Sequence, residues 1–143
     1  MNIGKLIENR PSSDIITVGI DQPVRDAVAI LASKRIGALP VMRGDTVAGI
    51  FSERDVIYRL ADEGQACLDL KVGDVMTAPA ITIDRDTDIL DALGLMSKRR
   101  IRHLPVLDGQ SMCGFISIGD LVQGRLNEIQ QEASAMRAYI QTA

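Results

Sequence analysis

The pattern Ser-x-x-Asp occurs twice, at Ser52 to Asp55 and at Ser117 to Asp120, each time directly after a short apolar run. A serine hydroxyl and free backbone N–H groups at the start of a helix bind anions such as phosphate, because the helix dipole favours negative charge there. A carboxylate one turn later can accept both hydroxyls of a ribose. The same two residues also form a capping box, which satisfies backbone donors of the helix. The motif alone favours the cap and leaves a ligand site open.

A nucleotide site would also need an apolar slot for the base. The segments that enter the predicted strands are apolar and could line such a slot. They are Ser12–Ile16, Ile36–Ala38, Thr77–Ile81 and Ile101–His103. The last of these also carries charge, so it could serve the phosphate as well as the base.

A basic cluster surrounds this last segment. Lys98, Arg99 and Arg100 end a predicted helix, where cations complement the helix C-terminus. Arg102 and His103 directly precede the apolar run LPVL and so lie at the mouth of a strand, where ligands of open sheets bind. We expect both to reach a phosphate, with an ordinary surface position as the equal alternative for His103. His103 is the only histidine, so neither a histidine metal cluster nor a Ser-His-Asp triad is expected.

The elements that position these residues are duplicated. Shifting the chain by 65 residues aligns IITVGIDQPVRDAVAILASKRIGALPVMRGDTVAGIFSERD with AITIDRDTDILDALGLMSKRRIRHLPVLDGQSMCGFISIGD without a gap. Glycine, proline, serine and aspartate coincide in this alignment, which chance similarity of low-complexity sequence would not produce. The short segments IGKLI and VGDVM precede the two copies and predict a lead-in helix for each. The chain is therefore an internal duplication.

Each copy predicts the element order β-α-β-β-α. A β-rich run, 15–18 or 80–83, leads into an amphipathic helix, and Pro23 suits an early position of the first helix. Two apolar runs separated by a turn at Gly44 or Gly109 then predict a hairpin, and a second helix begins at each Ser-x-x-Asp motif. A unit of about sixty residues is marginal alone. We therefore predict an α/β (α+β) fold in which the two copies pack sheet to sheet with pseudo-twofold symmetry.

Composition limits the class of protein. The 143 residues are 46% hydrophobic and 24% charged with a net charge of −3, which is typical of a soluble globular domain. The mild acidity and the scarcity of aromatic residues argue against a nucleic-acid binder. Cys67 and Cys113 stand far apart, which indicates free thiols in a reducing compartment. Without a signal-peptide-like start or a membrane-spanning apolar run, we expect a cytoplasmic protein with no membrane contact.

The chain after the second copy predicts a long helix from Gly119 to Ala143. Apolar residues recur along it with a 3.5-residue period, which suits packing against another helix. They are Val122, Leu126, Ile129, Ala133, Met136 and Ile140. The first two could instead complete the core of the second copy. We expect the later ones to pack on a second copy of the chain in a symmetric homodimer.

Both copies resemble the CBS domain, the regulatory motif named after cystathionine β-synthase, and the pair resembles a Bateman module. The resemblance rests on the lead-in VGDVMT, the LPV run, the turn glycine, GI or GF, and Ser-x-x-Asp, which occur in order. It implies two clefts between the repeats that take adenine nucleotides such as AMP, ADP, ATP or NAD(H). We divide the chain into repeat 1 (1–65), repeat 2 (66–126) and a dimerisation extension (127–143).

The resemblance also implies roles for particular residues. The motif aspartates hold the ribose, the motif serines approach ribose or phosphate, Ile16 and Ile81 contact the base, and Arg102 and His103 meet phosphate. Glu53 would repel a phosphate, and Gly119 offers no charge where the first repeat has Arg54, so the clefts should differ. The expected nucleotide-binding residues are Ile16, Gly37, Ala38, Ser52, Arg54, Asp55, Thr77, Ile81, Arg102, His103, Ser117 and Asp120.

The sequence offers little for catalysis. It has no nucleophile-base pair, metal cluster, P-loop or Gly-rich dinucleotide fingerprint. We therefore expect a regulatory sensor module without a catalytic cofactor, which signals the state of its adenine nucleotide to a separate protein. The alternative is a structural dimerisation module with vestigial clefts.

Overall fold

The computed structural model describes residues 1–142, so the predicted end of the last helix at Ala143 lies outside the described residues. The two halves repeat the same order of elements, as the duplication predicts. The elements of the first half are α1 (Ile3–Leu6), a 3-10 turn at Ser12–Asp14, β1 (Val18–Gly19), α2 (Val24–Lys34), β2 (Ala38–Arg43), β3 (Thr46–Ser52) and α3 (Glu53–Glu63). Those of the second half are a 3-10 turn at Gly64–Asp69, α4 (Val72–Val75), β4 (Ile83–Asp84), α5 (Ile89–Arg99), β5 (His103–Asp108), β6 (Ser111–Ser117) and α6 (Ile118–Thr142).

Each half forms a three-stranded sheet. The orders are β1-β2-β3 and β4-β5-β6, with the first pair of strands parallel and the second antiparallel. Gly44 and Gly109 turn the hairpins with φ of 59° and 64°, a backbone conformation that favours glycine. The strands β1 and β4 are shorter than predicted and begin at Val18 and Ile83, because only the last residues of the β-rich runs reach the sheet.

The helices α2 and α5 cover their sheets with equivalent residues. Val24, Ala27 and Leu31 are buried in α2, and Ile89, Ala92 and Met96 are buried in α5. This spacing places the three side chains of each helix on one face. Pro23 is the N-cap residue of α2, one position before the first helical residue, where its fixed φ suits the entry to the helix.

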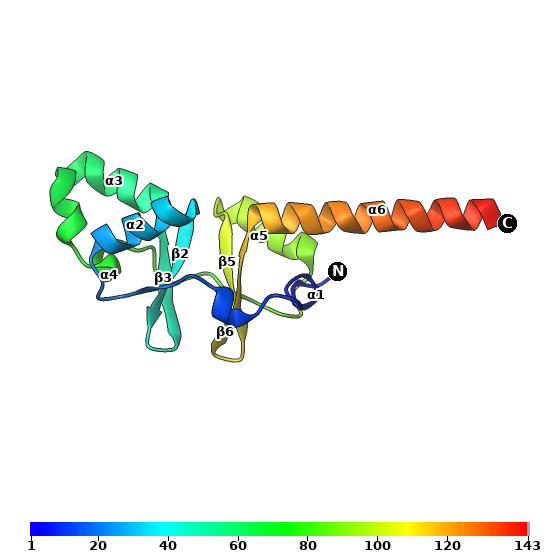
Figure 1. Ribbon diagram of the computed structural model, residues 1–143, viewed down its shortest axis with the longest axis horizontal. Coiled ribbons are helices and arrows are strands. Elements are labelled where there is room, and N and C mark those ends of the chain that lie inside the picture. Colours follow the sequence, from blue (N-terminus) through cyan, green and yellow to red (C-terminus); the bar gives the residue numbers. More distant parts are fainter. Residues whose placement is uncertain (143) are drawn as a thin grey trace.

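The two hydrophobic cores exchange their lead-in helices. Ile3 of α1 is packed in the core of the second sheet, and the Ile3 N–H donates to the Thr87 carbonyl at 2.9 Å. Val72 and Val75 of α4 are packed in the core of the first sheet. Figure 1 shows α1 beside β6 and α5, and α4 beside α2 and β3. Each half therefore needs a segment of the other to complete its core.

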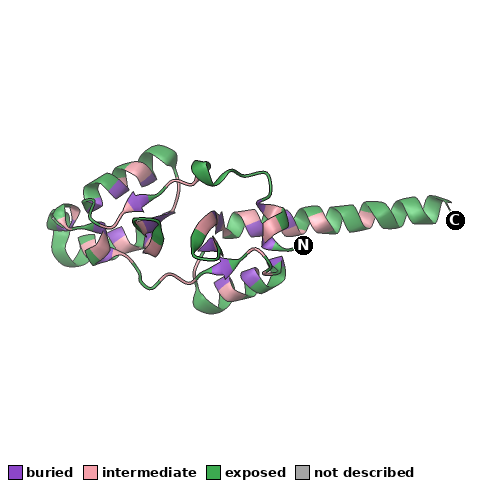
Figure 2. Ribbon diagram, turned by 90° about the horizontal axis from the view of Figure 1, so that it is seen from below, coloured by how far each residue is buried: buried purple, intermediate pink, exposed green. Residues whose placement is uncertain are grey.

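This exchange sends two chain segments across the junction between the halves (Figure 2). Gly49 and Gly114 let these segments pass close to β3 and β6. A Cβ atom added at Gly49 would lie 2.6 Å from the Thr77 carbonyl oxygen, and one added at Gly114 would lie 2.8 Å from Ile7 Cδ1. The aligned glycines thus provide space for the crossing segments that border the clefts described below.

The two sheets meet through β3 and β6, as expected for sheet-to-sheet packing, and the helices α2, α3 and α5 lie on the outer sides (Figure 1). The two halves form one continuous body, and α6 projects from it. The chain thus has the predicted mixed α+β architecture with a C-terminal helix.

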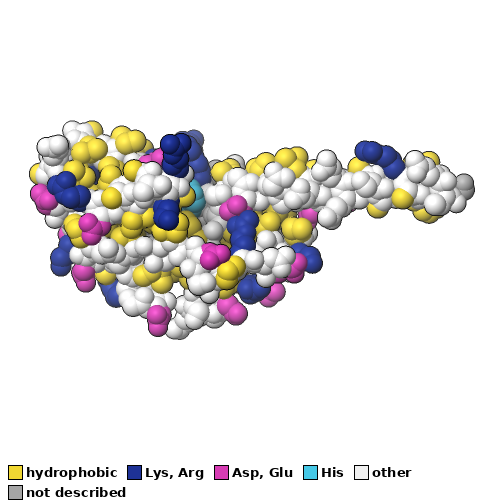
Figure 3. All heavy atoms as spheres, viewed as in Figure 1, with side chains coloured by type: hydrophobic (Ala, Val, Ile, Leu, Met, Phe, Trp, Pro, Cys, Tyr) yellow, Lys and Arg dark blue, Asp and Glu magenta, His cyan; other side chains and the backbone are white. Residues whose placement is uncertain are grey.

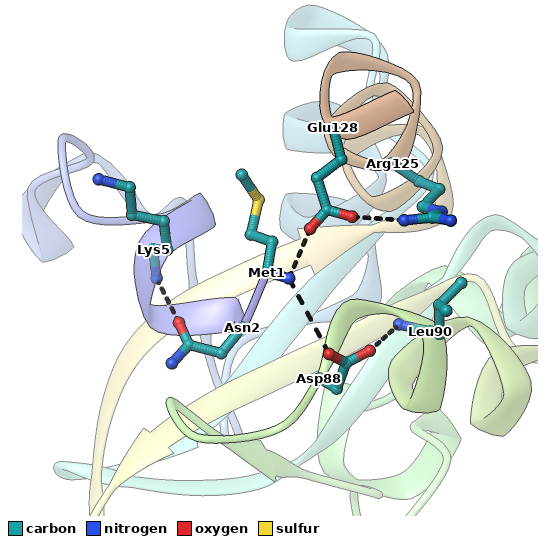
Figure 4. A network of polar contacts seen from close by, with 7 residues as sticks. All are labelled: Met1, Asn2, Lys5, Asp88, Leu90, Arg125 and Glu128. Carbon is teal, nitrogen blue, oxygen red and sulfur yellow. Dashed lines mark hydrogen bonds and ion pairs between the residues drawn. The ribbon is translucent and has the colours of Figure 1, made fainter. Parts of the chain in front are cut away.

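The first turns of α6 are anchored to the rest of the molecule, and its later turns are not. The amino group of Met1 lies between the carboxylates of Glu128 and Asp88, and Arg125 donates to Glu128 at 2.8 Å (Figure 4). Leu121 and Gly124 are buried, but no residue of 125–142 is. Figure 2 shows this exposed helix leaving the body of the protein.

Candidate functional site

The first cleft lies at the junction of the two halves and encloses about 350 Å³. Its walls come from the start of α3, from the segment that crosses toward β4, and from the loop between α5 and β5. The lining residues are Gly37, Ala38, Ile50, Ser52, Glu53, Arg54, Asp55, Tyr58, Thr77, Pro79, Ala80, Ile81, Arg100, Ile101, Arg102 and His103.

The Asp55 carboxylate is the centre of the polar contacts in this cleft. One oxygen, Oδ2, accepts from the Ser52 N–H at 2.8 Å and from the Ser52 hydroxyl at 3.1 Å. The other, Oδ1, accepts from the Thr77 hydroxyl at 3.0 Å. Thr77 belongs to the crossing segment, so this bond joins the two halves of the chain. The carboxylate is thereby held in place with acceptor capacity left for ligand hydroxyls.

The start of α3 is a complete capping box, as the cap interpretation predicts. A helix leaves four N–H groups without intrahelical partners at its start. Ser52 donates to Asp55, Glu53 donates to the Gly37 carbonyl, and Asp55 donates to the Ser52 hydroxyl. Only the N–H of Arg54 has no partner within the described residues. The helix start therefore offers a single backbone donor to an anion, fewer than the sequence suggested.

Cations in the first cleft come from three arginines of two different elements. Arg54 follows the cap of α3, whereas Arg100 and Arg102 precede β5. The Arg54 guanidinium donates to the Arg100 carbonyl oxygen at 3.4 Å, which places it beside the loop before β5. Glu53 lines the same cleft and opposes a negatively charged ligand. Figure 3 shows basic side chains gathered beside the junction of the two halves.

The second cleft repeats this arrangement around Asp120 and encloses about 290 Å³. It is bordered by the start of α6 and by the segment that follows α1. The lining residues are Ile7, Arg10, Pro11, Asp14, Ile15, Ile16, Ile36, Ala38, His103, Cys113, Gly114, Phe115, Ser117 and Asp120.

Asp120 forms the same cap as Asp55 but has a different second partner. Its Oδ2 accepts from the Ser117 N–H at 2.9 Å, and its own N–H donates to the Ser117 hydroxyl at 3.1 Å. Its Oδ1 accepts from the Arg10 guanidinium at 3.3 Å. Burial raises the pKa of Asp120, but the hydrogen bonds from Ser117 and Arg10 outweigh burial, so this pKa lies below its ordinary value. Asp120 is therefore ionised at neutral pH.

His103 lies between the clefts and lines both of them. Its ring stacks on Phe115 with a centroid distance of 5.5 Å and an interplanar angle of 14°. Burial lowers the pKa of His103, and Arg102 lowers it further, whereas Asp120 and Glu53 act in the opposite direction with a smaller net effect. His103 is therefore mainly neutral at pH 7 and can donate one hydrogen bond and accept another.

The structure brings all twelve predicted residues to these two clefts. Ser117, Asp120 and Ile16 line the second cleft, and Ala38 and His103 line both. The residues that line only the first cleft are Gly37, Ser52, Arg54, Asp55, Thr77, Ile81 and Arg102.

Sequence reasoning missed some cleft residues. Tyr58 lies one turn after Asp55 on α3, a spacing that could have indicated it. Phe115 aligns with Ile50 in the duplication, and both line a cleft. Arg10 has no equivalent in the gapless alignment of the copies, so the repeat carried no signal for it. Arg100, interpreted as a helix-end cation, also lines the first cleft.

Within residues 1–142, no group of three or more histidine, cysteine, aspartate or glutamate residues is arranged to hold a metal ion. No helix within this range is both long and apolar enough to span a membrane.

The protein is a duplicated α+β unit, and each of the two clefts between its halves contains one Ser-x-x-Asp motif. A family model described as "CBS domain" matches residues 4–62 and 72–127. The chain therefore belongs to the CBS-domain family and contains a pair of these domains.

Similar proteins agree with this assignment. The mitochondrial CBS domain-containing protein CBSX3 of Arabidopsis thaliana is 38% identical over 126 residues, which cover 85% of this chain and 61% of that protein. The structure of the CBS-domain containing protein ATU1752 from Agrobacterium tumefaciens has a TM-score of 0.80 and 33% identity over 87% of this chain and 92% of that one. CBSX2, solved in complex with AMP, has a TM-score of 0.76 and 26% identity over 88% and 96% of the two chains.

Proposed function

We propose that this protein is a regulatory module that binds adenine nucleotides, such as AMP, ADP, ATP or NAD(H), in the clefts between its repeats. The main support is the composition of the first cleft. Segments far apart in the sequence bring together a carboxylate that can bind ribose hydroxyls, three arginines and an apolar slot. The complex of the related CBSX2 with AMP supports an adenine-type ligand.

Each part of a nucleotide has a complementary group in the first cleft. The ribose hydroxyls donate to Asp55, whose charge strengthens these hydrogen bonds. Phosphate oxygens accept from Arg54 and Arg102, and from the free N–H of Arg54. The base lies in the apolar slot formed by Pro79, Ala80, Ile81 and Ile101.

The second cleft is the weaker site in this proposal. Among the described residues, Arg10 is the only lysine or arginine that lines it, and Asp14 and Asp120 oppose an anion there. The first cleft, by contrast, has three arginines against Glu53 and Asp55. A nucleotide should therefore fill the first cleft first.

Regulation follows from the position of the clefts. A ligand that touches both halves stabilises one arrangement of the halves over others, and such coupling is typically about 1 to 3 kcal/mol. We infer that a separate protein senses this arrangement and that the module itself catalyses no reaction.

We further propose that the module acts as a homodimer through its exposed helix faces. The exposed apolar side chains include Tyr58 on α3 and Leu126, Ile129, Met136 and Ile140 on α6. Figure 3 shows hydrophobic side chains along the surface of α6. The unsupported part of α6, from Ile129 onward, has the length at which isolated helices are only marginally stable. A second copy along the seam that ends at Ile140 would supply the missing contacts.

One observation favours a second candidate, a structural dimerisation module. Both capping boxes are complete without a ligand, so the Ser-x-x-Asp motifs have a structural role in any case. The two candidates differ in whether the clefts bind nucleotide.

Thermal denaturation with AMP, ATP, NADH and adenosine distinguishes the candidates. Selective binding to the folded state raises the melting temperature. We expect the wild-type protein and Asp45→Asn, an exposed turn variant, to be stabilised, and Asp55→Asn with Asp120→Asn together to lose this response. The proposal fails if no adenine compound raises the wild-type melting temperature at millimolar concentration.

A further inference from the structure

The second cleft contains an ion pair that has no counterpart in the first. Arg10 donates to Asp120 Oδ1 at 3.3 Å, while Ser117 occupies the other carboxylate oxygen. The Arg10 side chain is 47% exposed and that of Asp120 is 30% exposed. The guanidinium therefore lies at the rim of the cleft, where it can leave Asp120 without breaking the core.

The matching position in the first cleft is neutral. There the Thr77 hydroxyl, not a cation, donates to the free oxygen of Asp55 at 3.0 Å. A hydroxyl can donate to the carboxylate and still accept a hydrogen bond from a ligand, whereas a guanidinium has no acceptor. A ribose that approaches Asp120 must therefore compete with a charged donor, and a ribose that approaches Asp55 need not.

Few cationic groups in the second cleft are available to a ligand that displaces Arg10 from Asp120. Asp14 and Asp120 also line the second cleft, and no other lysine or arginine within residues 1–142 does. His103, the remaining titratable cationic group there, is half-buried with a lowered pKa. A guanidinium released from Asp120 is thus the only strong cation that a ligand in this cleft can meet.

We propose that Arg10 selects phosphorylated ligands in the second cleft by exchanging partners. In the structure it pairs with Asp120. When the ribose of a nucleotide takes Asp120, Arg10 moves to the phosphate of the same ligand. A nucleoside also displaces Arg10 from Asp120 but has no phosphate to accept its hydrogen bonds, so the second cleft discriminates against nucleosides. This inference rests on the proposed function and adds the selectivity of one cleft to it.

Removing Arg10 should change the binding of the two ligand types in opposite directions. The test uses the Asp55→Asn protein, in which the first cleft is weakened, and compares it with the same protein carrying Arg10→Gln. Isothermal titration with adenosine should show binding about two- to five-fold tighter without Arg10, because an exposed ion pair no longer competes. Titration with AMP should show binding about ten-fold weaker, because a charge-assisted hydrogen bond to phosphate is lost.

Two further variants control this experiment. Arg25→Gln breaks an ion pair of similar length with Asp69, at 3.4 Å, that lies outside both clefts, and it should leave both affinities unchanged. Arg10→Lys keeps the charge and should retain most of the preference for AMP. Melting temperatures of all variants verify folding.

The outcomes separate this inference from the proposed function. If Arg10→Gln weakens adenosine and AMP equally, or alters neither, the exchange is wrong. If the wild-type protein binds AMP but the Asp55→Asn protein does not, the second cleft is no nucleotide site and the inference fails while the proposed function stands. If the wild-type protein binds neither AMP nor adenosine, the proposed function itself is wrong.

Discussion

The two clefts share their backbone hydrogen bonds and differ in their charges. In each, a serine caps a helix and an aspartate completes the capping box. The residue after the serine donates its N–H to a carbonyl just before a strand: Glu53 to Gly37 in the first cleft, and Ile118 to Arg102 in the second. Three arginines line the first cleft, whereas the second has Arg10, which is already paired with Asp120. Duplication thus preserved the scaffold of the site, and substitutions at its rim made the two sites unequal.

The largest expected effect concerns the shared scaffold. Asp55→Asn keeps an acceptor for the Ser52 N–H but removes the charge that strengthens the ribose hydrogen bonds. With two such bonds weakened, AMP affinity at the first cleft should fall on the order of 100-fold in isothermal titration. Asp45→Asn, an exposed turn variant, should leave the affinity unchanged. If the Asp55→Asn protein binds AMP as tightly as the wild-type protein, Asp55 does not bind the ribose.

The next effect concerns the crossing segments that border the clefts. The space at Gly49 is bounded by the Thr77 carbonyl, which is backbone, whereas the space at Gly114 is bounded by the end of the Ile7 side chain. Gly49→Ala should therefore destabilise folding by about 1 to 2 kcal/mol, because backbone must shift. Gly114→Ala should cost less, because a side chain can change rotamer. Urea denaturation measures the free energy of unfolding of both variants. Equal decreases would contradict the expected difference between the two positions.

A smaller effect tests the charge difference between the clefts. Arg102→Gln should weaken ATP binding roughly five- to ten-fold and leave adenosine binding nearly unchanged, because only the phosphates meet Arg102. Raising the salt concentration should weaken ATP binding more in the wild-type protein than in this variant. Equal weakening of ATP and adenosine would show that Arg102 supports the cleft structurally instead.

The smallest effect concerns His103, which belongs to both clefts. Because its pKa is lowered by folding, the folded protein binds this proton less readily than the unfolded chain does. The stability that neutral His103 confers is complete above about pH 6.5 and is lost as the pH falls toward its folded pKa. His103→Phe keeps a ring that can stack on Phe115. Urea denaturation between pH 7.5 and 5.5 should show that this variant loses less stability than the wild-type protein as the pH falls. Equal losses would contradict the lowered pKa of His103.

The sequence predicted the fold and the cleft residues that the repeat contains twice. Residues copied by the duplication, such as Asp55 and Asp120, could be found because the repeat marks them twice. The fold followed from the same repeat together with turn glycines and helical spacing. The exchange of α1 and α4 between the cores could not be read from the alignment, because short apolar helices fit either core equally well by composition.

The sequence did not predict cleft residues whose position depends on the path of the chain. Arg10 became a cleft residue only through the path of the chain after α1, which no local pattern predicts. Arg100 was correctly placed at the end of a helix, but it also borders the first cleft, whereas its aligned counterpart Arg35 has the same left-handed backbone and lines neither cleft. Positions that depend on how segments cross are set by tertiary packing, not by local sequence.

The most direct test of the unequal clefts is a crystal structure determined with one equivalent of AMP per chain. We expect AMP in the first cleft, with its ribose on Asp55, its phosphate on Arg54 and Arg102, and the Arg10–Asp120 ion pair intact in the second cleft. AMP found in the second cleft alone, or at equal occupancy in both, would contradict it.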